Sequence, residues 1–267
     1  MTTPKSKKRL TVTDFAKMKS NGEKISMLTA YDFAMAKMLD AAGVDMLLVG
    51  DSLAMVVQGH ENTIPVTLDE MIYHGEMVAR AAKRAFVVVD IPFPVNHHGI
   101  HEAVKAAGRI MKKTGCHAVK LEGGADQADV IRAMVNAGIP VIAHVGLRPQ
   151  AVHAMGGYKV QRDRDELMAD ASAAQEAGAF CVLIECVPAE IATELSGKLR
   201  VPTIGIGAGA GCDGQVLVTN DMLGMTTGYV PSFVKAYANV AEQIASAVGQ
   251  WCEEVKENTF PDEDHSF

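Results

Sequence analysis

The chain has 267 residues, of which 48% are hydrophobic, and a formal net charge of −7 at pH 7. This length and apolar content suffice for one large core or two smaller ones, and the acidic balance argues against a nucleic-acid-binding protein, which needs a basic face. No stretch approaches the roughly 18 consecutive apolar residues of a membrane span, so we expect no membrane partner.

The five cysteines are odd in number and form no C-x-x-C pair. This pattern favours reduced thiols in the cytoplasm over disulfides or a zinc site. The basic stretch KSKKRL near the N-terminus is followed by a mixed sequence rather than an apolar one. We therefore expect a solvated, flexible tail over residues 1–12 and not a signal peptide. Residues 13–267 are expected to form a single catalytic domain.

Short apolar runs rich in Val and Ile alternate with helical patterns along the chain. Nearly continuous apolar character is typical of strands that are buried on both faces of a parallel sheet. The predicted strands cover residues 25–31, 45–51, 86–92, 118–124, 140–146, 180–186, 201–207 and, more weakly, 214–221. The predicted helices cover residues 32–43, 67–84, 101–114, 126–137, 163–177, 188–198 and 231–256.

Several helical segments end in glycine, as in AAG, KTG and NAG, which is typical of helix C-termini. About eight strand–helix units in a chain of this length predict an α/β fold, the (β/α)8 TIM barrel. A doubly wound open sheet is the alternative. Two long connections that contain glycine, residues 52–66 and 147–162, follow predicted strands. In a barrel they lie on the face that carries the active site.

Ionisable side chains lie late in the predicted strands or just after them. In AVKLEGG, strand alternation puts Val119 and Leu121 on one face, and Lys120 and Glu122 on the other. The apolar pair can pack on the helices, so the charged pair points into the barrel near its C-terminal mouth. The same place is expected for Asp51, Asp90, His144 and Glu185.

Each of these residues also has a structural interpretation. A single Asp at a strand end can cap a helix or a loop, and Lys120 with Glu122 could form a structural ion pair. Burying six ionisable groups on one face without a ligand is costly. The set as a whole therefore favours a binding and catalytic site.

The carboxylates predict a metal site. Carboxylates without cysteine ligands suit a hard cation, above all Mg²⁺. Asp51, Asp90 and Glu122 could hold the ion, directly or through water, while a substrate fills other positions. Mg²⁺ polarises a carbonyl group and stabilises an enolate. Glu185 then remains free as a base, and its apolar neighbours should make it a stronger base than a carboxylate in water.

The Gly-rich stretch GIGAGAGCDG (205–214) follows a predicted strand and resembles a phosphate-binding loop. It lacks the Lys-Ser/Thr pair of a Walker motif, and its spacing departs from the dinucleotide-binding pattern. Close approach of the backbone at the barrel mouth is therefore favoured over phosphate binding.

A series of longer motifs follows in order along the chain: TAYDFAMAKM, LLVGDSLAMVVQGHENTIPVT, VVVDIPF, VKLEGG, AHVGLRPQ, GGYKVQ, VLIECVP, IGIGAGAGCDGQVLV and DEDHSF. Together they resemble the ketopantoate hydroxymethyltransferase (3-methyl-2-oxobutanoate hydroxymethyltransferase) family from about residue 10 to the C-terminus. The chain departs from the family pattern in the loop IPFPVNHHG and at Ala54, Asn62, Arg148 and Asn220. None of these positions is one of the carboxylates.

The resemblance implies a (β/α)8 barrel enzyme. Its expected reaction transfers a hydroxymethyl group from 5,10-methylenetetrahydrofolate to 3-methyl-2-oxobutanoate through a Mg²⁺-stabilised enolate. The product is 2-dehydropantoate (ketopantoate), and the reaction is the first step of pantothenate biosynthesis. The resemblance also implies a homo-oligomer, which in the family is a decamer.

The resemblance assigns roles to individual residues. The proton acceptor is Glu185. The carboxylates associated with magnesium are Asp51, Asp90 and Glu122. The residues that contact or lie near the oxo acid are Asp51, Ser52, Asp90, Lys120 and His144. The resemblance does not identify the residues that contact the folate.

Two other functions stay open. One is a Mg²⁺-dependent oxo-acid aldolase or lyase of related barrel architecture that uses no folate, and a strict need for methylenetetrahydrofolate would exclude it. The other is a non-enzymatic sensor of small molecules on a barrel scaffold. A sensor needs no base, so loss of all turnover-linked function on changing Glu185 would count against it.

Overall fold

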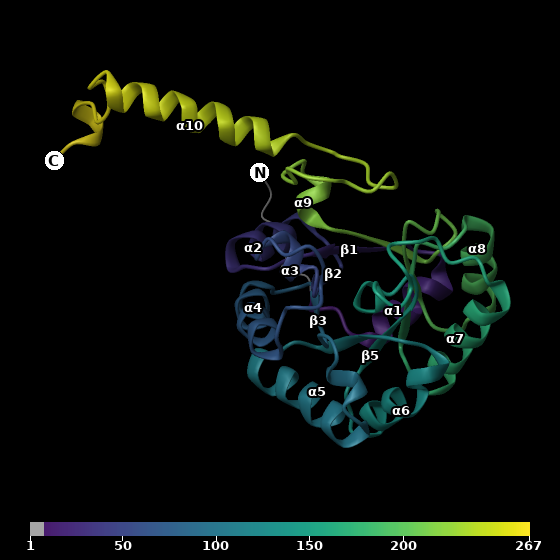
Figure 1. Ribbon diagram of the computed structural model, residues 1–267. Coiled ribbons are helices and arrows are strands. Elements are labelled where there is room, and N and C mark those ends of the chain that lie inside the picture. The colour runs from purple at the N-terminus through teal and green to yellow at the C-terminus, as the bar shows by residue number, and fades with distance from the viewer. Residues whose placement is uncertain (1–7) are drawn as a thin grey trace. The chain divides into compact units, whose positions relative to one another are not determined.

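The computed structural model describes residues 8–267, so most of the tail expected over residues 1–12 lies outside the described residues (Figure 1). The chain divides into two compact units, one up to Leu217 and the other Val218–Phe267. The single catalytic domain expected over residues 13–267 stays a prediction.

Eight parallel strands in the first unit form a closed barrel in which each strand pairs with its neighbours in chain order. The strands are β1 Ile25–Thr29, β2 Met46–Val49, β3 Phe86–Asp90, β4 Ala118–Glu122, β5 Val141–Gly146, β6 Cys181–Glu185, β7 Thr203–Ile206 and β8 Gly214–Leu217. Each observed strand lies inside its predicted range. The predicted barrel is therefore confirmed, and the open sheet is excluded.

Helices surround the strands of this unit, as Figure 1 shows. They are α2 Phe33–Ala42, α3 Leu53–Val56, α4 Leu68–Ala81, α5 Ile100–Thr114, α6 Ala128–Asn136, α7 Arg164–Glu176 and α8 Ala189–Lys198. Short 3-10 turns follow three of the strands: η1 Val95–His97, η2 Ala125–Gln127 and η3 Pro149–Ala151. A capping box starts α4, because the Glu70 carboxylate accepts hydrogen bonds from the backbone N–H and the hydroxyl of Thr67.

Side chains of strands β2 to β6 divide between two apolar layers. Val119 and Leu121 of β4 belong to the layer between the strands and the helices, together with Ile110 of α5 and Met134 of α6. Ala118 belongs instead to the layer inside the barrel. The predicted division of faces in β4 is therefore confirmed, and Lys120 and Glu122 lie on the face of Ala118.

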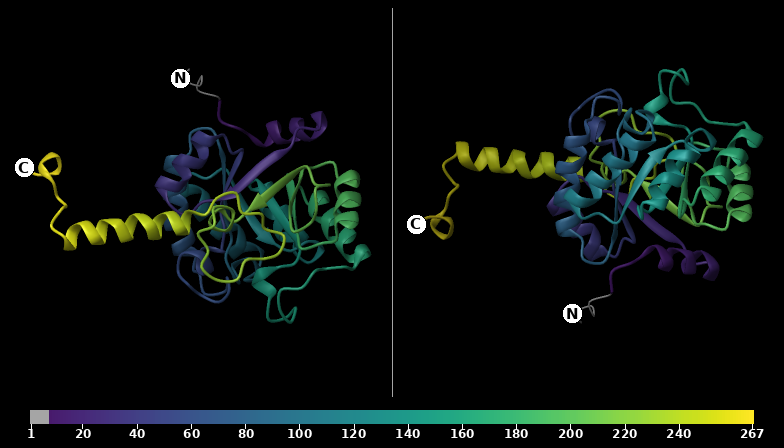
Figure 2. Two further views of the ribbon diagram at one scale, coloured as in Figure 1. Left: turned by 90° about the horizontal axis from the view of Figure 1, so that it is seen from above. Right: turned by 90° about the horizontal axis from the view of Figure 1, so that it is seen from below.

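Helix α1, Val12–Asn21, was not predicted. The Asp14 carboxylate accepts hydrogen bonds from the backbone N–H and the hydroxyl of Thr11, so a capping box starts the helix. Phe15 is fully buried and packs edge-to-face on Phe86 at the start of β3, with ring centroids 5.3 Å apart. Figure 2 shows α1 at the end of the barrel opposite the 147–162 connection. Because Phe15 is its only buried residue, α1 leaves a weak periodic signal in the sequence.

The connection between β7 and β8, residues 207–213, contains no helix and so departs from the predicted repeat. Its glycines pack against α8, because a Cβ on Gly209 would overlap Ala189 and one on Gly211 would overlap Thr193. The close backbone approach expected for this Gly-rich stretch is therefore confirmed, with α8 as the element approached.

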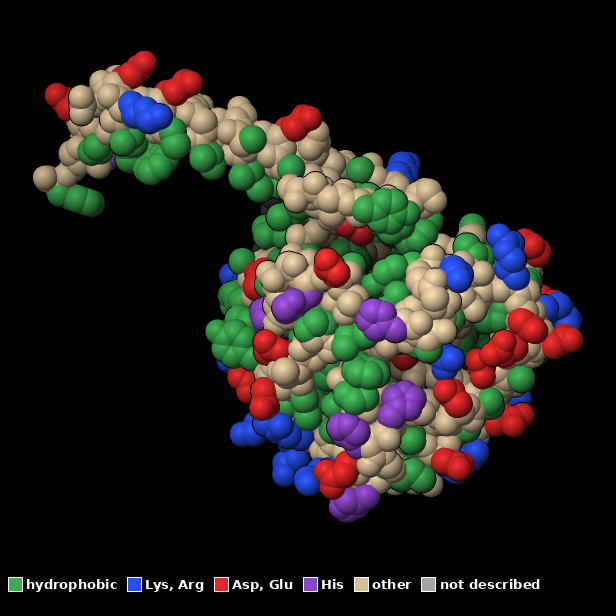
Figure 3. Space-filling model, in the orientation of Figure 1, with side chains coloured by type: hydrophobic (Ala, Val, Ile, Leu, Met, Phe, Trp, Pro, Cys, Tyr) green, Lys and Arg blue, Asp and Glu red, His purple; other side chains and the backbone are tan. Residues whose placement is uncertain are grey.

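The second unit contains α9 Thr219–Met222, α10 Val240–Lys256 and the 3-10 turn η4 Glu263–His265. The predicted start of its long helix at residue 231 was wrong, because Asn239 takes a non-helical conformation at the N-cap and the preceding aromatic and β-branched residues favour helix weakly. Apolar side chains at helical spacing run along one side of α10 and are exposed (Figure 3): Ile244, Val248, Trp251 and Val255. Among the described residues, no helix combines the length and apolar character of a membrane span.

Candidate active site

The C-terminal ends of five neighbouring strands bring the predicted ionisable residues together. Asp51 follows β2, Asp90 ends β3, Lys120 and Glu122 lie in β4, His144 lies in β5 and Glu185 ends β6. All of them except Glu185 are buried. Glu185 keeps 17% of its side-chain surface exposed, so a small molecule can reach it from the mouth of the barrel.

Lys120 is the cation of the site. Its ammonium lies 3.1 Å from Asp90 Oδ1 and 3.3 Å from His144 Nδ1. A structural ion pair between Lys120 and Glu122 was one expectation from the sequence. In the structure, Lys120 pairs instead with Asp90, the residue opposite it on β3. Burial opposes the charged form, but the surrounding carboxylates outweigh burial and raise the pKa of Lys120.

Asp90 and Asp51 lie next to each other. The backbone N–H of Asp51 donates a hydrogen bond to Asp90 Oδ2 at 3.0 Å. Burial raises the pKa of Asp90 to about 7, with Lys120 opposing and Asp51 adding to the shift. Gly50 keeps the turn tight, since a Cβ there would come within 2.8 Å of Ser52 Oγ.

Among the described residues, one carboxylate oxygen of Glu122 has a hydrogen-bond partner and the other has none. Its Oε2 accepts a hydrogen bond from the backbone N–H of Gln150 at 3.0 Å. Its Oε1 is buried and has no hydrogen-bond partner among the described residues. Burial, and next the charge of Asp51, hold the pKa of Glu122 well above its usual range. A cation or a donor at Oε1 would therefore stabilise the charged form.

His144 stands between Lys120 and Glu185. Because an ammonium group can only donate, Nδ1 of His144 must accept the hydrogen bond from Lys120. Burial, together with the charge of Lys120, lowers the pKa of His144, so its ring is neutral and carries its proton on Nε2. That nitrogen lies 3.2 Å from Glu185 Oε2. Although the two atoms are close, Nε2 of His144 has no hydrogen-bond partner among the described residues.

The backbone around Glu185 is fixed by the 147–162 connection. The Glu185 carbonyl accepts a hydrogen bond from Leu147 N–H at 2.9 Å, and the Cys186 carbonyl accepts one from Gln161 N–H at 2.8 Å. Cys186 has a φ of 48°, in the left-handed region that non-glycine residues rarely adopt. The chain thus turns sharply just after Glu185.

Ser52 contacts a residue that was not predicted for the site. The hydroxyl of Tyr31, two residues after the end of β1, lies 2.8 Å from Ser52 Oγ. Tyr31 is buried, and burial raises its pKa, so the hydroxyl stays protonated. In the sequence, only its place at the end of a predicted strand pointed to Tyr31 as a site residue. An uncharged aromatic residue there is as readily explained by packing.

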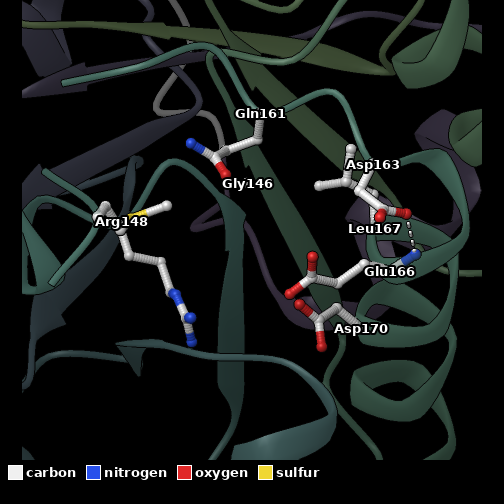
Figure 4. A pocket seen from close by; sticks show the side chains of 8 residues that line it. Gly146, Arg148, Gln161, Asp163, Glu166, Leu167 and Asp170 are labelled. Atoms are coloured by element: carbon white, nitrogen blue, oxygen red, sulfur yellow. Dashed lines mark hydrogen bonds between the residues drawn. The ribbon is translucent and has the colours of Figure 1, made fainter. Parts of the chain in front are cut away.

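A polar hollow lies between the end of β5, the connection that follows it and α7 (Figure 4). It is lined by Gly146, Arg148, Met155, Gln161, Asp163, Glu166, Leu167 and Asp170. Glu166 and Asp170 lie next to each other on α7, while Arg148 lies across the hollow and pairs with Asp126 at 2.9 Å. None of the residues predicted for catalysis or binding lines this hollow, although Gly146 is the strand partner of Glu185.

The donor set suits a hard cation. Within residues 8–267, no group of three or more His, Cys, Asp or Glu side chains forms a preassembled metal site. Mg²⁺ commonly uses only one or two carboxylates and completes its shell with water and substrate oxygens. The unpartnered Oε1 of Glu122 and the adjacent carboxyl groups of Asp51 and Asp90 fit that manner of binding.

Comparison with solved structures shows the same fold in enzymes of low sequence identity. Phosphonopyruvate hydrolase, solved with oxalate and Mg²⁺, aligns with a TM-score of 0.62 and 13% identity over 96% of this chain and 93% of that chain. 2,3-Dimethylmalate lyase aligns with a TM-score of 0.59 and 18% identity over 96% of this chain and 91% of that chain. These likenesses concern the fold alone.

Sequence comparison is more specific. Residues 9–263 match the family model for ketopantoate hydroxymethyltransferase. The 3-methyl-2-oxobutanoate hydroxymethyltransferase of Rhodopirellula baltica is 57% identical over 263 residues, which cover 98% of each chain. That of Syntrophus aciditrophicus is 53% identical over 271 residues, which cover the whole of both chains. The resemblance inferred from the motifs is confirmed, and the chain belongs to the ketopantoate hydroxymethyltransferase family.

Proposed function

We propose that this chain transfers a hydroxymethyl group from 5,10-methylenetetrahydrofolate to 3-methyl-2-oxobutanoate. The product is ketopantoate, and the reaction is the first step of pantothenate biosynthesis. The full-length relatives support this proposal, since they are named for a hydroxymethyltransferase that acts on 3-methyl-2-oxobutanoate. The observation that carries it is the buried series of contacts from Asp90 through Lys120 and His144 to Glu185.

The proposal includes Mg²⁺, held by Asp51, Asp90 and Glu122 directly or through water. When bound, the ion would supply polarisation of the keto group and stabilisation of an enolate. The contacts of these residues support the assignment, because Glu122 Oε1 has no hydrogen-bond partner among the described residues. Lys120, already paired with Asp90, adds the positive charge that a carboxylate substrate needs.

Four side chains would act on the oxo acid. Lys120 offsets the charge of its carboxylate, and the hydroxyl of Ser52 donates a hydrogen bond to one of its oxygens. Glu185 removes the proton from C3. Of the carboxylates predicted for the site, Glu185 alone is partly exposed. The N–H on Nε2 of His144, 3.2 Å from Glu185 Oε2, would orient Glu185. Carbon C3 then bonds to the one-carbon unit of the folate, and one water molecule supplies the hydroxyl as tetrahydrofolate leaves.

A turnover assay tests the proposal and separates it from the two alternatives. The chain is incubated with 3-methyl-2-oxobutanoate and Mg²⁺, with and without methylenetetrahydrofolate. Ketopantoate should form only when the folate is present. An aldolase or lyase would act without folate, and a sensor would bind the oxo acid but form no product in either case.

We further propose a cytoplasmic homo-oligomer, a decamer as in the family. The exposed apolar side chains of α10 support self-association, since contiguous apolar surface is usually covered by a partner. The five cysteines are free thiols, in keeping with a reducing compartment. Light scattering on the purified chain measures the assembly, and a monomeric mass at micromolar concentration would overturn this part of the proposal.

A further inference from the structure

Gln150 touches the ends of three strands from the 147–162 connection. Its backbone N–H donates to Glu122 Oε2 at 3.0 Å. Its side-chain Nε2 donates to Asp51 Oδ2 at 2.8 Å and to the Ile91 carbonyl at 3.0 Å. Ile91 directly follows Asp90, so one residue links the neighbourhood of all three proposed metal carboxylates. The side chain is buried, with only 6% of the residue exposed.

The orientation of the Gln150 amide is fixed by chemistry. A carboxylate oxygen and a carbonyl oxygen can only accept hydrogen bonds, so the NH₂ group of the amide must face both Asp51 and Ile91. Both of its N–H bonds are then used. The amide oxygen Oε1 is buried without a hydrogen-bond partner among the described residues and stays available as an acceptor.

Asp51 and Glu122 are both buried carboxyl groups that Gln150 connects. Gln150 donates one hydrogen bond to each of the two carboxylates without adding charge. These hydrogen bonds to Oδ2 of Asp51 and Oε2 of Glu122 orient the two carboxyl groups. Glu122 Oε1 has no hydrogen-bond partner among the described residues.

We propose that Gln150 is a positioning residue that holds Asp51 and Glu122 in the orientation that binds the divalent cation. This inference rests on the proposed function, in which those carboxylates hold Mg²⁺. Partners that orient metal ligands typically contribute about 10–100-fold to metal affinity. In this role Gln150 acts through the carboxylates.

The test compares Gln150→Met with Gln127→Met. Methionine keeps the length and packing of glutamine but removes both side-chain donors. Gln127 is the matched control because it is also 6% exposed and lies nearby, yet its side chain contacts Asn96 and His97 and no carboxylate. Mn²⁺ binding is followed by electron paramagnetic resonance with 3-methyl-2-oxobutanoate present. Melting curves report whether each variant folds.

Gln150→Met should bind Mn²⁺ about 10–100-fold more weakly than the wild-type chain, while Gln127→Met should bind it as the wild-type chain does. If Gln150→Met does not fold, Gln150→Asn serves as the test variant. Its side chain keeps an amide but is too short to reach both Asp51 and Ile91. Wild-type affinity in the folded variant, or an equal loss in Gln127→Met, would overturn the role of Gln150 while leaving the proposed function intact. Failure of the wild-type chain to bind Mn²⁺ at all would overturn both.

Discussion

Nε2 of His144 lies 3.2 Å from Oε2 of Glu185, and Lys120, on the other side of the ring, determines that this nitrogen carries the proton. A neutral imidazole in this position orients a carboxylate without neutralising it. This arrangement is what a base for removing a carbon-bound proton requires.

Metal removal should abolish activity. Asp51, Asp90 and Glu122 gather at one mouth of the barrel, so we expect turnover to stop in EDTA and to return when Mg²⁺ is added. Asp90→Asn should sharply raise the Mg²⁺ concentration needed for half-maximal rate. Full turnover by the metal-stripped chain in excess chelator would contradict the metal assignment.

Lys120→Met should weaken binding of the oxo acid while the chain stays folded. The variant keeps the aliphatic stem but removes the charge beside Asp90, and loss of such a buried charge contact is worth about 2–5 kcal/mol in binding. Calorimetry with 3-methyl-2-oxobutanoate measures it. The control is Lys19→Met, which breaks a more exposed pair with Asp213 outside the site. Normal oxo-acid binding by folded Lys120→Met would show that Lys120 has only a structural role.

Phe15→Ala should destabilise the barrel. Phe15 is fully buried against Phe86, and replacing a buried Phe by Ala typically costs about 3–5 kcal/mol in the free energy of unfolding. Chemical denaturation measures the change, with Phe33→Ala as the control because Phe33 is 46% exposed. Equal stability of the two variants would mean that α1 contributes little to the barrel.

His117 should make the chain less stable in mild acid. Burial, and then the charge of Arg9, lower the pKa of His117 from 6.5 to about 4. The unfolded chain therefore takes up this proton at a higher pH than the folded chain does. The stabilising contribution is complete above pH 6.5 and is lost as the pH falls toward 4.

The free energy of unfolding, measured between pH 4 and pH 7, tests this dependence. Its decline with falling pH should be smaller in His117→Gln than in the wild-type chain, because glutamine does not titrate. Parallel curves for the two proteins would show that His117 titrates alike in the folded and unfolded states.

The barrel could be predicted from the sequence because buried parallel strands leave runs of apolar residues that local patterns detect. Alternation within such a run also predicts which side chains face inward, as for Lys120 and Glu122. Helix α1 was missed because its local signal is weaker, since Phe15 is its only buried residue.

The acidic and basic residues of the site could be predicted because each is conspicuous in an apolar strand. Gln150 and Tyr31 could not be predicted, because each acts through a contact with a residue far away in the chain. Gln150 reaches Asp51 across 99 positions, and Tyr31 reaches Ser52 across 21. No local pattern encodes such pairs, so only the folded barrel reveals them.

Proton removal by Glu185 can be separated from carbon transfer by hydrogen exchange. If enolisation precedes attack on the folate, the chain with Mg²⁺ should exchange the C3 hydrogen of 3-methyl-2-oxobutanoate for deuterium even without folate. Glu185→Gln keeps the shape of the side chain but removes the basic oxygen. Glu190→Gln, on the exposed first turn of α8, is the matched control.

The exchange is followed by proton NMR in D₂O for the wild-type chain and both variants, and calorimetry verifies that each binds the oxo acid. Glu190→Gln should exchange at the wild-type rate. Glu185→Gln should lose about 10²–10⁴-fold in both exchange and turnover, the usual contribution of a positioned base, while oxo-acid binding changes much less. Exchange at the wild-type rate in Glu185→Gln would contradict the assignment of Glu185 as the base.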